Sequence, residues 1–127
     1  MARIRTIKPG LWSDDLVADL SRDARLLFIG LISLADDEGR FVASAATLAG
    51  HIYPHDELPP TTIRRWLREI ETKDREHAER TGKGLSVVLY QVGRAQYGWL
   101  PKYRRHQRIS HPQPSALPPP PGEETLL

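Results

Sequence analysis

The chain has 127 residues, of which 39% are hydrophobic and 27% charged, and these values suit one water-soluble globular domain with an extension and exclude wholesale disorder. The absence of cysteine excludes a disulfide framework, a thiolate zinc site and a thiol nucleophile, and we expect a cytoplasmic protein without a membrane span. The formal net charge is only +2, so the distribution of charge is more informative than its sum.

Basic residues are concentrated in stretches that contain no acid. These stretches are 3–8, 64–68 and 94–108, and the acids gather at 14–23, 36–38 and 69–79. A phosphate-binding surface needs such segregation, because an ordinary solvated surface mixes both signs. Chance clustering in a basic protein is the alternative interpretation.

The first helix is expected to begin after Ser21, whose hydroxyl can cap free backbone N–H groups, with Asp23 adding negative charge to the first turn. Apolar residues continue at helical spacing to Leu34, which predicts the central helix of the core. An acidic turn at 36–38 and Gly39 end this region, and 40–43 is a short strand candidate.

Two further helices are expected after this strand. Ser44 caps a second helix that Pro54 ends, and Thr61 or Thr62 caps a third helix after a proline-rich turn. One stripe of the third helix is apolar and should face the core; it consists of Ile63, Trp66, Leu67 and Ile70. Burial of this stripe turns the opposite side outward, and that side carries Arg64, Arg65 and Arg68.

The last third of the chain has three parts. The segment 71–84 keeps helix-supporting Glu–Arg pairs without an apolar stripe, so it is either an exposed extension of the third helix or a mobile loop. Residues 85–92 and 96–100 are strand candidates around a tight turn at 93–95, which predicts a β-hairpin with a basic tip. The remaining Pro-rich segment should be disordered or extended and contribute little to folding.

This order of elements predicts a mainly α fold with a small antiparallel β wing, that is, an α+β winged helix-turn-helix. We divide the chain into an N-terminal arm (1–20), a winged helix-turn-helix DNA-binding domain (21–108) and a Pro-rich tail (109–127).

Four sequence blocks carry a resemblance to a known family. They are residues 1–9 with Trp12, residues 21–31, residues 34–40, and residues 102–109 with the prolines that follow. Together they resemble phage and prophage replisome-organiser-like proteins, whose N-terminal winged helix is related to DnaD-type replication initiators. The likeness extends from residue 1 to about residue 117. It implies DNA binding near a phage replication or regulatory locus.

The third helix is the expected recognition element. Arg65 and Arg68 are predicted to contact base edges, since an Arg can bind guanine through two hydrogen bonds, and Arg64 to contact phosphate. Thr61 and Thr62 either contact phosphate at the helix start or act only as caps.

Flanking segments are expected to hold the phosphate backbone. On the wing, Arg94 and Gln96 suit a phosphate or minor-groove contact. The basic segment after the last strand is either a backbone contact or a charged linker, and its candidates are Lys102, Arg104, Arg105 and Arg108. The arm is either a minor-groove contact or disordered, and its candidates are Arg3, Arg5 and Lys8.

Metal-dependent or catalytic chemistry finds little support. Asp36, Asp37 and Glu38 are adjacent carboxylates that more often solvate a turn, and the pair His51 and His55 is separated by the helix-ending Pro54. No nucleophile, base and acid at a recognisable spacing and no glycine-rich phosphate loop are present. We therefore expect neither an enzyme nor a cofactor.

The sequence thus predicts a phage-type protein that binds double-stranded DNA and acts in replication initiation or gene regulation. Replication or host proteins are further candidate partners, and a homodimer is compatible with this interpretation. The alternative is a winged-helix adaptor that binds another protein through its wing or its Pro-rich tail.

Overall fold

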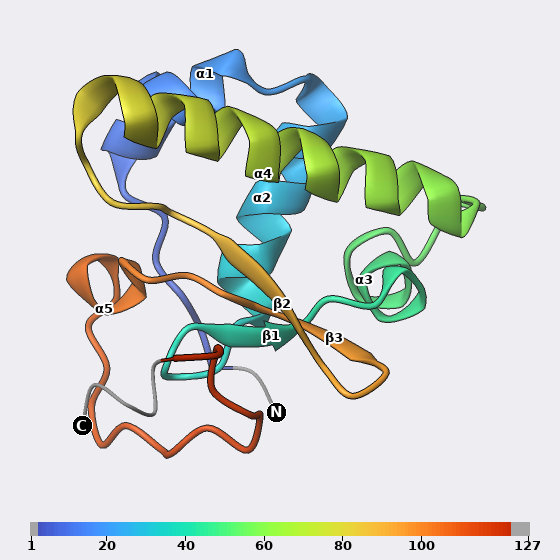
Figure 1. Ribbon diagram of the computed structural model, residues 1–127. Helices are drawn as coiled ribbons and strands as arrows, with labels where there is room; N and C mark the ends of the chain where they lie inside the picture. Colours follow the sequence, from blue (N-terminus) through green and yellow to red (C-terminus); the bar gives the residue numbers. More distant parts are fainter. Residues whose placement is uncertain (1–2, 123–127) are drawn as a thin grey trace.

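The computed structural model describes residues 3–122 and has a mixed α+β fold (Figure 1). In chain order the elements are η1 (Pro9–Ser13, a 3-10 helix), α1 (Asp15–Asp19), α2 (Arg22–Leu34), β1 (Arg40–Val42), α3 (Ala45–Ile52), α4 (Pro60–Thr81), β2 (Val88–Val92), β3 (Ala95–Trp99) and α5 (Tyr103–His106). The expected mixture of helices with a small antiparallel sheet is confirmed.

The three strands form one antiparallel sheet in the order β1-β3-β2. The predicted hairpin is present as β2 and β3, and Gly93 at its turn has φ +62°. On β3, Gly98 is paired with Phe41 of β1, and a Cβ at Gly98 would lie 2.1 Å from the Phe41 ring. Glycine at this position therefore lets the aromatic ring lie directly over the central strand.

Helix α2 is the central helix of the core, as its apolar repeat predicted. Ser21 caps it by accepting a hydrogen bond from the amide of Ala24, and both Leu27 and Leu31 are completely buried. Leu26 of the same helix is 49% exposed. It lies off the face that the other helices cover.

Helix α4 buries the apolar stripe predicted for it. Ile63 and Ile70 are almost fully buried, and the Trp66 ring packs against Tyr53 with 5.3 Å between ring centroids. The hydroxyl of Tyr53 donates to the carbonyl oxygen of Asp23 at 2.9 Å, which ties the end of α3 to the start of α2. Burial raises the pKa of Tyr53 to about 12, so the hydroxyl remains a donor at neutral pH.

The segment that sequence left open between helix and loop is helical up to Thr81. Gly82 ends α4 in the left-handed conformation with φ +72°. The extension is anchored by Asp74, a buried carboxylate that accepts hydrogen bonds from the amides of Ser86 and Val87. Asp74 thus fixes where the chain enters β2.

The structure draws the N-terminal boundary differently from the sequence. Leu16, Val17 and Leu20 belong to the same buried cluster as α2 and α4, so residues 15–20 are part of the domain rather than an arm. Asp14 starts α1 by accepting hydrogen bonds from the amides of Leu16 and Val17. The segment was missed because α1 has only five residues, too few for a periodic pattern.

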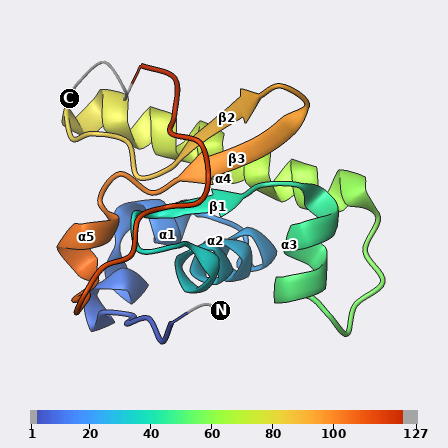
Figure 2. The same cartoon turned by 90° about the horizontal axis from the view of Figure 1, so that it is seen from below.

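The tail also differs from its expected behaviour within the described residues, because it crosses the sheet on the face turned away from α4 (Figure 2). On this outer face, Tyr90 and Tyr97 stack with ring centroids 5.8 Å apart. The Tyr90 hydroxyl donates to the carbonyl oxygen of Pro118 at 2.6 Å, and the Arg40 guanidinium donates to that of Leu117 at 2.9 Å. The tail is extended, as predicted, but it covers aromatic side chains of the sheet.

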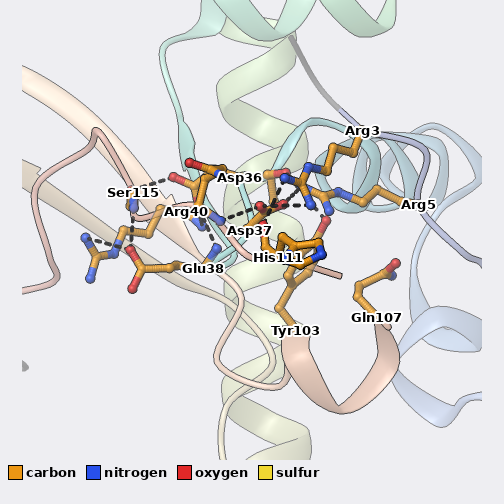
Figure 3. A network of polar contacts seen from close by, with 12 residues as sticks. Arg3, Arg5, Asp36, Asp37, Glu38, Arg40, Tyr103, Gln107, His111 and Ser115 are labelled. Atoms are coloured by element: carbon orange, nitrogen blue, oxygen red, sulfur yellow. Dashed lines mark hydrogen bonds and ion pairs between the residues drawn. The ribbon is translucent and has the colours of Figure 1, made fainter. Parts of the chain in front are cut away.

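The acidic turn after α2 joins both ends of the chain (Figure 3). The carboxylate of Asp37 accepts hydrogen bonds from the Arg5 guanidinium and from the backbone N–H of Gln113, both at 2.9 Å. Ser115 of the tail donates two further hydrogen bonds, one from its hydroxyl to Asp36 and one from its backbone amide to Glu38. These three acids therefore hold protein groups rather than solvent.

Candidate nucleic-acid interface

The exposed side of α4 carries unpaired positive charge. Arg64, Arg65 and Arg68 are all exposed, and within residues 3–122 none of them forms an ion pair or a side-chain hydrogen bond. They lie opposite the buried Ile63 and Trp66, as the helical spacing predicted. A guanidinium with no internal partner keeps all of its donors available to a ligand.

The predicted helix cap at Thr61 or Thr62 was wrong. Pro59 is the N-cap residue, and Pro60 occupies the first position of the helix, where its fixed φ fits and its missing N–H costs nothing. Thr61 is exposed in the first turn and Thr62 is half-buried. The two hydroxyls therefore lie at the start of α4 without a capping role.

A groove of about 310 Å³ separates α4 from the β2–β3 hairpin. Arg64 and Arg68 line it from the helix, and Gln91 and Gln96 line it from the strands. Glu71 is the one acid on this lining, and its carboxylate lies 3.9 Å from the Arg75 guanidinium. The groove thus combines two free cations with two amides, groups that can bind phosphates and base edges.

The two α4 arginines that line the groove are not the two that the sequence predicted to act together. Sequence reasoning placed Arg65 beside Arg68 and set Arg64 apart, whereas Arg64 and Arg68 share the groove and Arg65 does not line it. Arg94 is exposed at the hairpin turn and has no internal partner in the described chain. The hairpin is therefore free to contact a ligand that also lies along α4.

The second basic group lies away from the hairpin tip. Arg104 and Arg105 are exposed on the single turn of α5, and Arg108 is exposed just after it. Lys102 is half-buried, with its Nζ 3.4 Å from the Ser86 hydroxyl. In Figure 1, α5 and the hairpin turn are at opposite ends of the sheet, so the two groups do not form one patch. Four-residue α5 itself was not predicted.

One titratable group of α5, His106, is affected by both burial and the neighbouring positive charges. The pKa of His106 is lowered, first by partial burial and then by the nearby charges of Lys8, Lys102 and Arg105. Asp14 acts in the opposite direction. The lowered pKa favours the neutral form of His106, so lysine and arginine supply most of the charge of this region.

The N-terminal basic residues contact the protein itself. Arg5 has a side chain only 5% exposed, and it donates to Asp37 and to the carbonyl oxygen of Ala35, both at 2.9 Å. Arg3 donates to the carbonyl oxygens of Ser110 and His111, and Lys8 to that of Arg105. The described part of the arm is therefore ordered, and a minor-groove contact by the exposed Arg3 and Lys8 stays a prediction. Arg5 has a structural role, because its buried charge is neutralised by Asp37 within the protein.

No group of three or more His, Cys, Asp or Glu side chains suited to a metal ion occurs among residues 3–122. Asp37, the central acid of the turn, is committed to Arg5 and to Gln113. The pKa of Asp37 is lowered, mainly by the hydrogen bond from the Gln113 amide and also by Arg5 and Arg3, against the effect of burial.

Among the described residues, no helix combines the length and the apolar character that a bilayer span requires. Comparisons with protein-family models, with curated proteins and with solved structures find no match to this chain.

Proposed function

We propose that this protein is a winged helix-turn-helix that binds double-stranded DNA, with α4 as its recognition helix and the β2–β3 hairpin as its wing. The observation that carries the proposal is the free guanidinium groups of Arg64, Arg65 and Arg68, exposed opposite the stripe that α4 buries. Such groups gain most from phosphates and guanines, which accept paired hydrogen bonds.

The arrangement of elements supports the proposal. Helix α3, the proline-rich turn and α4 have the order of a helix-turn-helix, and the hairpin follows α4 and pairs through β3 with β1. The groove between α4 and the hairpin places Arg64, Arg68 and Gln96 on one surface. The resemblance to replisome-organiser-like proteins suggests that the site serves phage replication initiation or gene regulation.

The adaptor alternative is less well supported. Its Pro-rich ligand would be the tail, but the carbonyl oxygens of Leu117 and Pro118 already accept hydrogen bonds from Arg40 and Tyr90. A partner domain would have to displace these contacts before binding the tail.

The test compares single variants on a duplex selected from a random pool and on a scrambled duplex. Arg64→Ala and Arg68→Ala should each weaken binding to the selected duplex by about 1–3 kcal/mol and weaken the scrambled duplex much less. Arg104→Ala should weaken both equally, because a phosphate contact carries no sequence information. Arg75→Ala is the matched control, since this exposed arginine lies further along α4 beside Glu71.

Equal losses on both duplexes for Arg64→Ala and Arg68→Ala would remove the assignment of α4 as the recognition helix. Unchanged binding by every variant would contradict the proposal that these arginines bind DNA.

A further inference from the structure

A second concavity lies at the other end of the molecule, apart from the groove between α4 and the hairpin. It has a volume of about 340 Å³ and lies where the N-terminal segment passes over α2 and α5. Its wall is largely apolar and includes Leu11, Val17, Phe28, Ile32 and Leu100. Small-molecule sites are mostly apolar cavities of this size with few polar groups.

The wall formed by the N-terminal segment is fixed in position. The Gln107 side chain is buried, and its amide group donates to the carbonyl oxygen of Thr6 while its oxygen accepts from the amide of Thr6. The Thr6 hydroxyl donates to the carbonyl oxygen of His106. The cavity is thus formed without a ligand, and binding need not order this segment.

Among the charged groups of the lining, cations outnumber anions. Lys8 and Lys102 contribute two ammonium groups, and neither forms an ion pair with a carboxylate in the described chain. Ser86 adds a hydroxyl next to Lys102. The acid on the lining is Asp14, one of whose carboxylate oxygens accepts hydrogen bonds from the backbone amides of Leu16 and Val17 at the start of α1. The polar part of the cavity therefore favours an anion.

We propose that this cavity binds a small amphipathic carboxylate, with its hydrocarbon chain against Phe28 and Ile32 and its carboxylate between Lys8 and Lys102. At roughly 30 Å³ for each water-sized group, the volume accommodates about ten non-hydrogen atoms. An eight-carbon fatty acid has this size. The cavity is separate from the proposed recognition groove, because no α4 residue lines it.

Isothermal titration calorimetry with octanoate tests the proposal, with octanol and octylammonium as probes of the same length. We expect saturable 1:1 binding of octanoate, weaker binding of octanol and the weakest binding of octylammonium, because only octanoate satisfies both the apolar wall and the cations.

Two variants test the contacts of the ligand's carboxylate and of its hydrocarbon part separately. Lys102→Gln should weaken octanoate at least fivefold and leave octanol unchanged. Ile32→Phe, which fills part of the cavity, should weaken both ligands. Lys83→Gln is the control, since this exposed lysine does not line the cavity. Circular dichroism of each variant verifies the fold.

Absence of saturable octanoate binding, or equal affinity for octanoate and octylammonium, would overturn the proposal. So would octanoate binding that neither folded variant weakens, since the ligand would then lie elsewhere.

Discussion

Removing one partner of the ion pair between Asp37 and Arg5 should destabilise the protein strongly, and the substitution Asp37→Ala tests this. The side chains of both residues are 5% exposed, and their charged atoms are 2.9 Å apart. Removing the carboxylate leaves the Arg5 charge in a site shielded from water, and also leaves the Gln113 amide without its acceptor.

Breaking a buried pair by removing one partner costs about 3–5 kcal/mol. Arg5 keeps its hydrogen bond to the carbonyl oxygen of Ala35 and its position 5.3 Å from the centre of the Tyr103 ring, so we expect a value near 3 kcal/mol. A domain of this length loses roughly 4 °C of melting temperature per kcal/mol, which predicts a fall of about 12 °C.

Thermal unfolding followed by circular dichroism measures this fall. The double variant Arg5→Met, Asp37→Leu is the matched comparison, because removing both charges together avoids a buried unpaired ion and should recover most of the loss. A fall of less than about 3 °C for Asp37→Ala, or a double variant no more stable than the single one, would refute the reasoning.

Three further predictions concern the core, the tail and pH. Trp66→Ala should destabilise the protein by about 3–5 kcal/mol in urea unfolding, and Leu26→Ala, at an exposed position of α2, should leave the midpoint nearly unchanged; equal midpoints would contradict the packing of α4. Removal of residues 111–127 should cost about 1–3 kcal/mol, because it uncovers Tyr90 and leaves the acids at 36–38 without tail partners; an unchanged midpoint would support the view that the tail is only a linker. The pKa of Asp37 is lowered in the folded protein, so its contribution to stability is complete above about pH 5 and is lost as the pH falls through 3.8 toward the lowered value. Urea unfolding midpoints measured from pH 7 to pH 2 should therefore decline less steeply for Asp37→Asn than for the wild-type protein. Parallel declines of the two proteins would contradict this prediction.

Local signals in the sequence predicted much of the fold. Capping by Ser21 and Ser44, and the apolar stripe around Trp66, fixed α2, α3 and the buried side of α4, because these signals lie within a few residues of each other. The hairpin followed from the same kind of information, since its turn is Gly93 and Arg94 between strand-forming residues.

Contacts between distant residues were not predictable in this way. Arg5 and Asp37 are 32 residues apart, and Thr6 and Gln107 are 101 apart, so no local pattern relates them. The contacts of the tail were not predicted, because its composition cannot form a core of its own. Its backbone amides and carbonyls nevertheless form hydrogen bonds with Asp37 and Arg40.

The candidate site, too, was predictable from the sequence only where local geometry decides it. Outward exposure of Arg64, Arg65 and Arg68 followed from helical geometry alone. Which of them lie beside the hairpin depends on how α4 packs across the sheet, and this tertiary information placed Arg64 rather than Arg65 in the groove.

The central claim, that the arginines of α4 bind duplex DNA, is tested most directly by the salt dependence of binding. For a protein that neutralises about six phosphates, the logarithm of the binding constant should fall against the logarithm of salt concentration with a slope near −5. The triple variant Arg64→Gln, Arg65→Gln, Arg68→Gln should weaken binding to the selected duplex at every salt concentration, because each base-edge contact is worth about 1–3 kcal/mol, and should lower the slope only by the phosphates that these arginines neutralise. A triple variant with the wild-type affinity and slope, or a wild-type protein that does not bind duplex DNA at low salt, would contradict the account.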